Sequence, residues 1–147
     1  MSLHKIPISV LVVIHTADLQ ALLLERADHP GYWQSVTGSC EPGETPYRTA
    51  VREVREETGL EAEAFRLSDW NLRYEFEIYP EWRHRYAPGV THNTEHVFGL
   101  ELPSPLPVRL ALREHLNYLW LPRAAAVQKV FSWSNAAALE KLAPEQT

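Results

Sequence analysis

Residues 38 to 60 read GSCEPGETPYRTAVREVREETGL, and this stretch carries most of the information in the chain. Thr45 followed by Pro46 predicts a helix start, because threonine can accept from a free backbone N–H and proline suits the first helical position. Gly59 predicts the helix end, since glycine readily adopts the left-handed conformation. The stretch therefore predicts a loop, a helix and a second loop.

The expected helix has two kinds of surface. At about 100° per residue, one stripe is expected to pack against a core: Tyr47, Ala50, Val54 and Thr58. Glu53 and Glu57 lie together along the edge of this stripe, where they would face a cleft. Glu56 lies one turn beyond Arg52, a spacing that favours an ion pair.

Two carboxylates on one side of a helix repel each other, and the cost rises near a packed surface unless a cation joins them. Oxygen ligands favour Mg²⁺ or Mn²⁺, and Mg²⁺ recruits substrate phosphates as further ligands. A phosphate ester or anhydride is therefore the expected substrate. The alternative is a solvated acidic helix face paired with arginines, which is the usual interpretation of an isolated EVREE string.

Nine positions of the stretch resemble the Nudix box: Gly38, Glu44, Arg52, Glu53, Val54, Glu56, Glu57, Gly59 and Leu60. The resemblance implies an α/β fold, a Nudix-type α/β/α sandwich with a mixed central sheet and a loop-helix-loop box. It also implies metal-assisted hydrolysis of a phosphoanhydride, with Glu53 and Glu57 as metal ligands and catalytic groups. In the family, the residue at Glu44 holds the arginine at Arg52, and Glu56 stands beside them.

Glu114 is the carboxylate outside the box that attracts most interest, because it precedes an expected strand. Many Nudix proteins supply a later glutamate that completes the metal site or activates water, so Glu114 is expected to be catalytic and metal-binding. The alternative is a surface glutamate at a strand entrance. His115 is more often structural and is left out of the site.

Length and composition limit the function classes. The chain has 147 residues and 45% hydrophobic content, which predicts one domain over residues 1–147. A net charge of −5 argues against nucleic-acid or anionic-membrane binding, so the expected phosphate ligand is a small molecule; the resemblance given below implies a triphosphate. The single cysteine, Cys40, fits a reducing compartment, and the apolar run 8–14 is too short to span a bilayer. We expect a cytoplasmic protein, of open oligomeric state.

Periodicity predicts the remaining elements. Strands are expected over residues 8–14, 21–26, 33–36, 73–79, 94–102 and 115–121, and helices over 122–130 and 134–142. Strands sandwiched by helices indicate an α/β/α arrangement.

A phosphate tail also needs positive charge and hydroxyl groups. Lys5 precedes the first expected strand and Arg26 ends the second, so both are candidates for phosphate binding at the rim of the sheet. Thr37 precedes the box glycine and offers a hydroxyl. Each of the three could instead be solvated or structural. Arg83, His84 and Arg85 form a basic cluster that could contact phosphate or a partner subunit.

Further stretches narrow the resemblance: PISVLVVI, YWQSVTGS, WRHRYAPGVTHNTEHVF and EHLNYLWL. They resemble the branch of the Nudix family that serves bacterial folate biosynthesis. This implies 7,8-dihydroneopterin triphosphate as substrate, with dihydroneopterin monophosphate and pyrophosphate as products. Two alternatives remain: a Nudix hydrolase of nucleoside triphosphates or dinucleoside polyphosphates, and a non-catalytic Nudix module that senses a phosphorylated ligand. The second usually lacks box carboxylates, which are all present here.

A pterin would fit the strand that contains YEFEIY. Phe76 and Ile78 point to one side and Glu77 and Tyr79 to the other, so a flat ring could rest on the strand while Glu77 accepts from its amino-pyrimidinone edge. A half-buried strand with solvated acids explains the pattern equally well. Ser132, or Ser134 with Asn135, is expected to cap the last helix, whose N-terminus could also meet a polar substrate atom or a phosphate oxygen.

Overall fold

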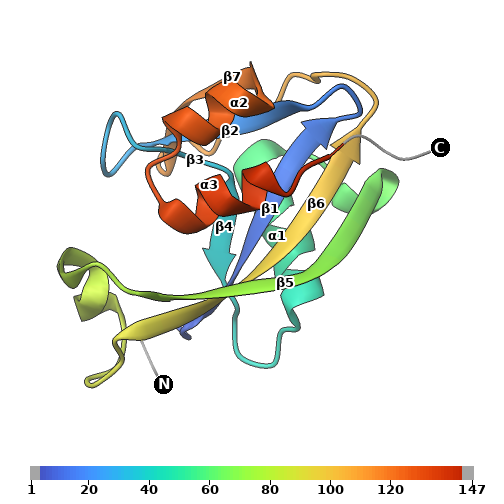
Figure 1. Ribbon diagram of the computed structural model, residues 1–147. Coiled ribbons are helices and arrows are strands. Elements are labelled where there is room, and N and C mark those ends of the chain that lie inside the picture. Colours follow the sequence, from blue (N-terminus) through green and yellow to red (C-terminus); the bar gives the residue numbers. More distant parts are fainter. Residues whose placement is uncertain (1–3, 144–147) are drawn as a thin grey trace.

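The computed structural model describes residues 4–143, which form a mixed sheet between helices on both faces (Figure 1). The strands are β1 (Ile8–Thr16), β2 (Gln20–Arg26), β3 (Trp33–Gln34), β4 (Val36–Ser39), β5 (Arg66–Glu77), β6 (His92–Leu102) and β7 (His115–Pro122). The helices are α1 (Pro46–Thr58), α2 (Arg123–Lys129) and α3 (Trp133–Glu140), with short 3₁₀ turns η1 (Ala62–Ala64) and η2 (Pro80–Arg85). The expected α/β/α sandwich with a mixed sheet is confirmed.

β1 is the central strand of the sheet. It pairs with β6 in parallel along its whole length, and antiparallel with β4 and β2. β5 extends the sheet beyond β6, while β3 and β7 both pair with β2. From Ser9 onward every residue of β1 is buried, as its run of valine and isoleucine indicates for a strand covered on both faces.

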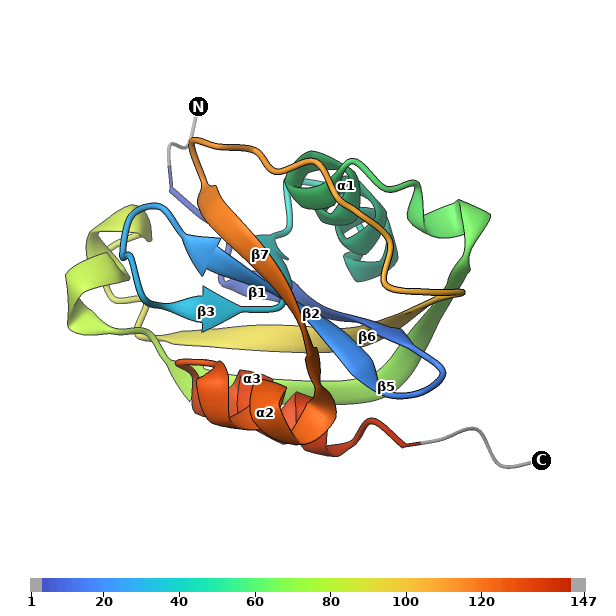
Figure 2. The same ribbon diagram turned by 90° about the horizontal axis from the view of Figure 1, so that it is seen from above.

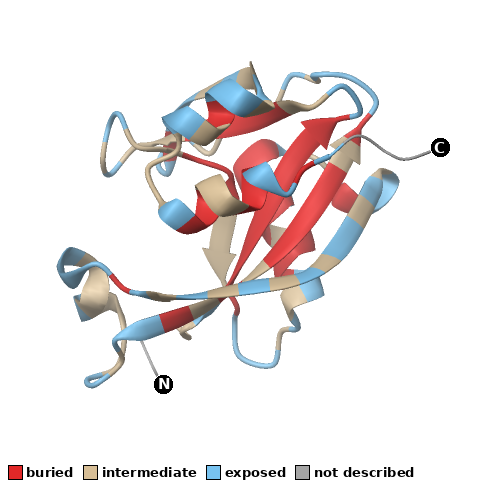
Figure 3. Ribbon diagram, viewed as in Figure 1, coloured by how far each residue is buried: buried red, intermediate tan, exposed pale blue. Residues whose placement is uncertain are grey.

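Two apolar layers fill the space on either side of the sheet. Figure 2 shows α1 on one face and α2 and α3 on the other, and in Figure 3 the buried residues gather on the central strands between them. Ala50 and Val54 of α1 pack with Val12 and Ile14 of β1 in the first layer. The second layer joins the other face of β1 to α2 and α3: Leu11, Val13, Ala126, Ala138 and Leu139. Of the three α-helices in residues 4–143, α1 alone packs on the first face of the sheet, and it packs there against the central strand β1.

The ends of α1 form as the sequence predicts. The Thr45 hydroxyl accepts a hydrogen bond from the backbone N–H of Arg48, and Gly59 ends the helix at φ +77°. The packed stripe was predicted correctly except at Tyr47, which is 37% exposed. Tyr47 lies in the first turn and donates its hydroxyl to Glu63 instead. No helix in the described part of the chain is long and apolar enough to cross a membrane.

The strand expected over residues 73–79 was wrong at both ends. β5 begins at Arg66, and a bulge between Asp69 and Leu72 breaks the alternation that would have indicated its first half. In the bulge, Asn71 adopts φ +53° and donates its backbone N–H to the Asp69 carboxylate. At the other end, β5 stops at Glu77, so the residues at 78 and 79 lead into η2.

We expect Gly59→Ala to lower the free energy of unfolding by about 1–2 kcal/mol, because alanine resists a positive φ. The added Cβ would also lie 3.3 Å from the Cβ of Arg109. Urea denaturation measures the loss. Gly43→Ala is the matched control, since Gly43 has the same φ of +77° but open space around it. A Gly59 variant no less stable than the Gly43 variant would contradict the crowding.

Candidate functional site

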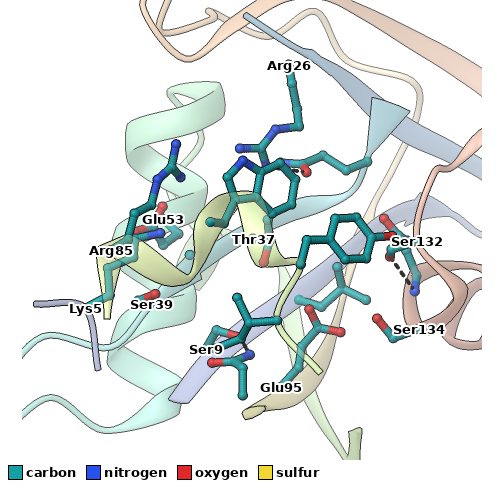
Figure 4. Close-up of a pocket in the computed structure, with 18 of the residues that line it drawn as sticks. Lys5, Ser9, Arg26, Thr37, Ser39, Glu53, Arg85, Glu95, Ser132 and Ser134 are labelled. Carbon is teal, nitrogen blue, oxygen red and sulfur yellow. Dashed lines mark hydrogen bonds between the residues drawn. The ribbon is translucent and has the colours of Figure 1, made fainter. Parts of the chain in front are cut away.

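A cavity of about 560 Å³ opens where α1, the start of β1, the start of β6 and the N-terminus of α3 converge (Figure 4). It gathers most of the side chains singled out in the sequence: Lys5, Arg26, Thr37, Arg52, Glu53, Glu57, Phe76, Glu77, Ile78, Tyr79, Glu114 and Ser132. Glu44 and Glu56 do not line it. One region, the acidic centre, consists of Glu53 and Glu57 on α1. A second, the β6 end, consists of Ser9, Asn93, Glu95 and Ser134.

The acidic centre is buried. Glu53 is 9% exposed and Glu57 only 1%. Neither carboxylate oxygen of Glu57 makes a hydrogen bond of ordinary geometry, although the Glu53 carboxyl and the backbone of Thr37 lie close enough to affect its pKa. Burial raises the pKa of both groups, and the carboxyls of Glu53 and Glu114 raise the pKa of Glu57 further. Two unpartnered buried acceptors beside a second carboxylate are a donor set suited to a hard divalent cation. The residues therefore fit the metal that the sequence predicts.

Close packing around Gly38 positions Glu53. The residue lies on β4, beside α1, and a Cβ built on it would lie 2.1 Å from Cδ of Glu53. Any side chain at this position would push the glutamate away from its place. The box glycine is thus required for a close approach between helix and strand.

Arg52 organises the outer side of the acidic centre through all five of its N–H donors. The guanidinium donates twice to Glu44, at 2.8 and 2.9 Å, and once to the backbone carbonyl of Ser39 at 3.0 Å. Its remaining two donors meet Glu53 at 2.7 Å and Glu56 at 3.2 Å. Because arginine offers five donors in a planar fork, this network fixes β4, the loop and the helix relative to one another.

Glu114 and His115 enter the cavity from the beginning of β7. Among the residues that the structure describes, no three His, Cys, Asp or Glu side chains meet as a ready metal-binding group. Glu114 is exposed and lines the cavity, close enough to raise the pKa of Glu57. His115 is buried with Nε2 3.7 Å from Oε1 of Glu57, and burial lowers its pKa to about 4. The imidazole is therefore neutral near pH 7 and does not compensate the Glu57 charge.

Besides Arg52, four basic side chains border the cavity: Lys5, Arg26, Arg85 and Arg113. Lys5 and Arg85 lie next to each other, since the backbone N–H of Lys5 donates to the carbonyl of Arg85 at 2.8 Å. Arg26 is held within the cavity wall: its fork donates to Asp28 in two bonds of 2.7 Å and to Gln34 at 3.0 Å, and both partners also line the cavity. A bidentate grip of Arg26 on phosphate would require it to leave Asp28. Of the basic cluster at 83–85, the structure brings Arg85 to the cavity, a choice the sequence left open.

The other expected substrate contacts lie in the wall. Thr37 donates its hydroxyl to the carbonyl of Val10 at 2.8 Å, and Ser132 caps α3 by accepting from the backbone N–H of Asn135 at 3.2 Å. Phe76, Ile78 and Tyr79 line the cavity, although only the first belongs to a strand.

Sequence reasoning missed two parts of the site. Trp82 was not assigned to core or interface; it stacks on Tyr79 at 5.3 Å between ring centroids and carries the Arg26 guanidinium 4.7 Å from its ring centre. The β6 end was missed because its polar residues read as the outer face of a strand. The alternation of Asn93, Glu95 and Val97 was a usable signal, since it puts two polar side chains on the same face as a core valine.

Comparison with known proteins gives a consistent result. The family model described as NUDIX domain matches residues 5–142. The chain is 48% identical over 141 residues to the dihydroneopterin triphosphate diphosphatase of Escherichia coli (strain K12), covering 94% of this chain and 93% of that protein. It is 45% identical to the Haemophilus influenzae protein of the same name, covering 90% and 85%. The solved structure of the E. coli dihydroneopterin triphosphate pyrophosphohydrolase aligns with a TM-score of 0.89, at 47% identity, covering 96% and 97% of the two chains.

We expect Glu44→Gln to remove part of the acid sensitivity of folding. Hydrogen bonds from Arg52 lower the pKa of Glu44 from 4.5 to about 2 in the folded protein. The folded state therefore binds fewer protons than the unfolded state between these values, so the contribution of Glu44 is present above pH 4.5 and is lost as pH falls toward 2. Denaturant unfolding at pH 7, 4 and 3 should show a smaller fall for the variant than for the wild type.

The control is Glu75→Gln, an exposed glutamate on β5 that lies outside the network. Its stability should follow the wild-type pH curve. A Glu44 variant with the same pH dependence as the wild type would show that the Arg52 pairing does not contribute to acid stability.

Proposed function

The chain belongs to the Nudix family, and from that membership we propose that it hydrolyses 7,8-dihydroneopterin triphosphate to dihydroneopterin monophosphate and pyrophosphate. The curated relatives that cover almost the whole chain support this substrate by their names. We further propose a role in folate biosynthesis and a cytoplasmic location. The cysteine Cys40 is free and buried, which agrees with a reducing compartment.

One observation carries the catalytic part of the proposal: the unpartnered carboxylate of Glu57, 1% exposed, borders a cavity large enough for a small phosphorylated ligand. A buried carboxylate without hydrogen bonds is costly to maintain unless a cation compensates it. A solvated acidic face, the alternative interpretation of the EVREE string, would leave these oxygens in water. The burial of Glu57 is the reverse of that expectation.

We propose that Glu53 and Glu57 hold Mg²⁺, with Mn²⁺ as a substitute, and that Glu114 contributes from the segment that precedes β7. A metal held there would supply positive charge to the phosphate oxygens and would polarise a water molecule for in-line attack on phosphorus. Arg52 orients the Glu53 carboxylate through its 2.7 Å hydrogen bond and favours its ionised form, which opposes the burial that raises the pKa of Glu53. Gly38 keeps the same carboxylate from being displaced by β4.

The remaining groups orient the substrate and move a proton. Lys5 and Arg85 lie at the rim beside the acidic centre and bind the outer phosphates of the tail. Glu114 is the general base: its exposed carboxylate borders the cavity and can accept the proton of the attacking water, while Glu57 is enclosed. Cleavage between the α and β phosphates then leaves pyrophosphate at this basic rim.

Pyrophosphate release from 7,8-dihydroneopterin triphosphate, measured with and without Mg²⁺ beside a panel of nucleoside triphosphates, tests the proposal. We expect Mg²⁺-dependent turnover and a higher kcat/KM for the pterin. A nucleotide with equal or higher kcat/KM would contradict the pterin assignment and keep the hydrolase. No turnover of any compound would contradict both.

Glu57→Gln should lower kcat by at least about a hundredfold, because the amide cannot supply the charge that holds the metal. Calorimetry with Mg²⁺ should show correspondingly weaker binding. Glu63→Gln serves as the control, since Glu63 is exposed in η1 and lies outside the cavity. A folded Glu57 variant with near-normal kcat would refute its assignment as a ligand.

A further inference from the structure

The β6 end of the cavity contains two buried polar side chains that take no part in the proposed metal site. Asn93 is 3% exposed and Glu95 5%, and both line the cavity. They stand two residues apart on β6, so their side chains leave the same face of the sheet. In Figure 4, Glu95 lies beside Ser9 and Ser134, across the cavity from Glu53 and Lys5.

Each of the two side chains has one acceptor without a partner. The Asn93 amide donates to the Ser9 hydroxyl at 2.8 Å, which leaves Oδ1 unbonded. Glu95 accepts a hydrogen bond from Ser134, which leaves Oε1 unbonded. No ion pair joins Glu95 to a cationic side chain anywhere in residues 4–143. Burial raises the pKa of this carboxyl to about 7.

Buried acceptors without a partner require an explanation, because each loses its hydrogen bonds to water on folding and gains none within the protein. These two point to a ligand that brings donors. A metal is a poor fit, since an isolated carboxylate beside amide and hydroxyl groups lacks the further charges of the acidic centre. An aromatic heterocycle that carries several N–H groups on one edge is a good fit.

We propose that Glu95, supported by Asn93, binds the amino-pyrimidinone edge of the substrate and thereby selects the pterin ring. This inference rests on the proposed function and adds the residues that determine its specificity. The edge presents a ring N–H and an exocyclic amino group side by side, and an ionised carboxylate accepts from both. The side-chain oxygen Oδ1 of Asn93 accepts a hydrogen bond from a further N–H group of the ring.

The same chemistry predicts what the site rejects. The corresponding edge of adenine presents a ring acceptor next to its amino group, so the Glu95 carboxylate would face a lone pair. Guanine shares the two adjacent donors of the pterin. The β6 end should therefore distinguish adenine from the other two rings more sharply than it distinguishes guanine from the pterin.

Two aromatic side chains support a flat ring at this place. Trp133, at the start of α3, is 57% exposed and borders the cavity next to Ser134. Phe76 borders the cavity from β5, the strand that pairs with β6. An exposed tryptophan beside a polar pocket gives a heterocycle a surface to stack on.

Glu77, the acceptor that the sequence suggested, is less suited to this role. Its side chain is 66% exposed and its carboxylate is already bound by Arg83. A carboxylate in solvent contributes little discrimination, because water competes for every donor. Glu95 is enclosed and has an acceptor to spare.

The test separates the ring-binding site from the reaction by measuring two quantities. The first is the dissociation constant of 7,8-dihydroneopterin, which has no phosphates and needs no turnover. The second is the ratio of kcat/KM for the pterin triphosphate to that for ATP. For Glu95→Gln, which keeps the volume but turns an amide donor toward the ligand, we expect the dissociation constant to rise ten- to about a hundredfold and the ratio to fall as much.

Glu95→Asp keeps the charge and withdraws it by one methylene. The dissociation constant should therefore rise, and the kcat/KM ratio fall, by at least about tenfold. This second variant keeps the test valid even if the amide variant folds poorly. Glu75→Gln is the matched control, because it makes the same change on the neighbouring strand outside the cavity.

The outcomes distinguish the two proposals. Dissociation constants for the folded Glu95 variants within about threefold of wild type would overturn the ring-binding site, whatever the turnover. So would a wild-type protein that binds neither dihydroneopterin nor guanosine. A wild-type protein that binds dihydroneopterin through Glu95 but hydrolyses only nucleotides would overturn the proposed function and leave the site standing.

Discussion

The structure depends on one electrostatic constraint: two carboxylates one helical turn apart are both buried from solvent. Glu57 is almost completely enclosed, and its partner Glu53 is pressed against a strand residue that has no side chain. Such a pair is stable only with compensating positive charge. The position of α1 on the sheet, the glycine on β4 and the arginine network around the helix all serve to keep this unfavourable pair in place.

The compensation is distributed rather than local. Arg52 pairs with the outer carboxylate and ties it to the loop before the helix, whereas in the described part of the chain no cationic side chain donates a hydrogen bond to the enclosed carboxylate of Glu57. His115 stands near enough to help but is kept neutral by its own burial. This leaves the inner oxygens open to a metal and its phosphate ligands. A protonated histidine there would compete with the metal.

The sequence predicted the box helix and the α/β/α arrangement well because both depend on local rules. Thr45, Pro46 and Gly59 specify helix ends by backbone chemistry that needs no tertiary context. It failed at β5, where Asn71 in a bulge interrupts the alternation, and at Glu95, whose burial depends on α3 covering β6 from a distant part of the chain. Local pattern identifies a strand's polar face, but only packing decides whether that face meets water.

The parallel pairing of β1 with β6 has a consequence for how such a protein can diversify. One side of β1 supports β4 and the box helix, while the other side supports the strand that carries Asn93 and Glu95. On the proposal above, substitutions at the start of β6 would alter which ring is recognised. Farther along the same strand, Phe98, Leu100 and Leu102 belong to the core layer that supports α1. On that proposal, a lineage would take up a new substrate by changing the first residues of β6, while the rest of the strand keeps the box helix in place.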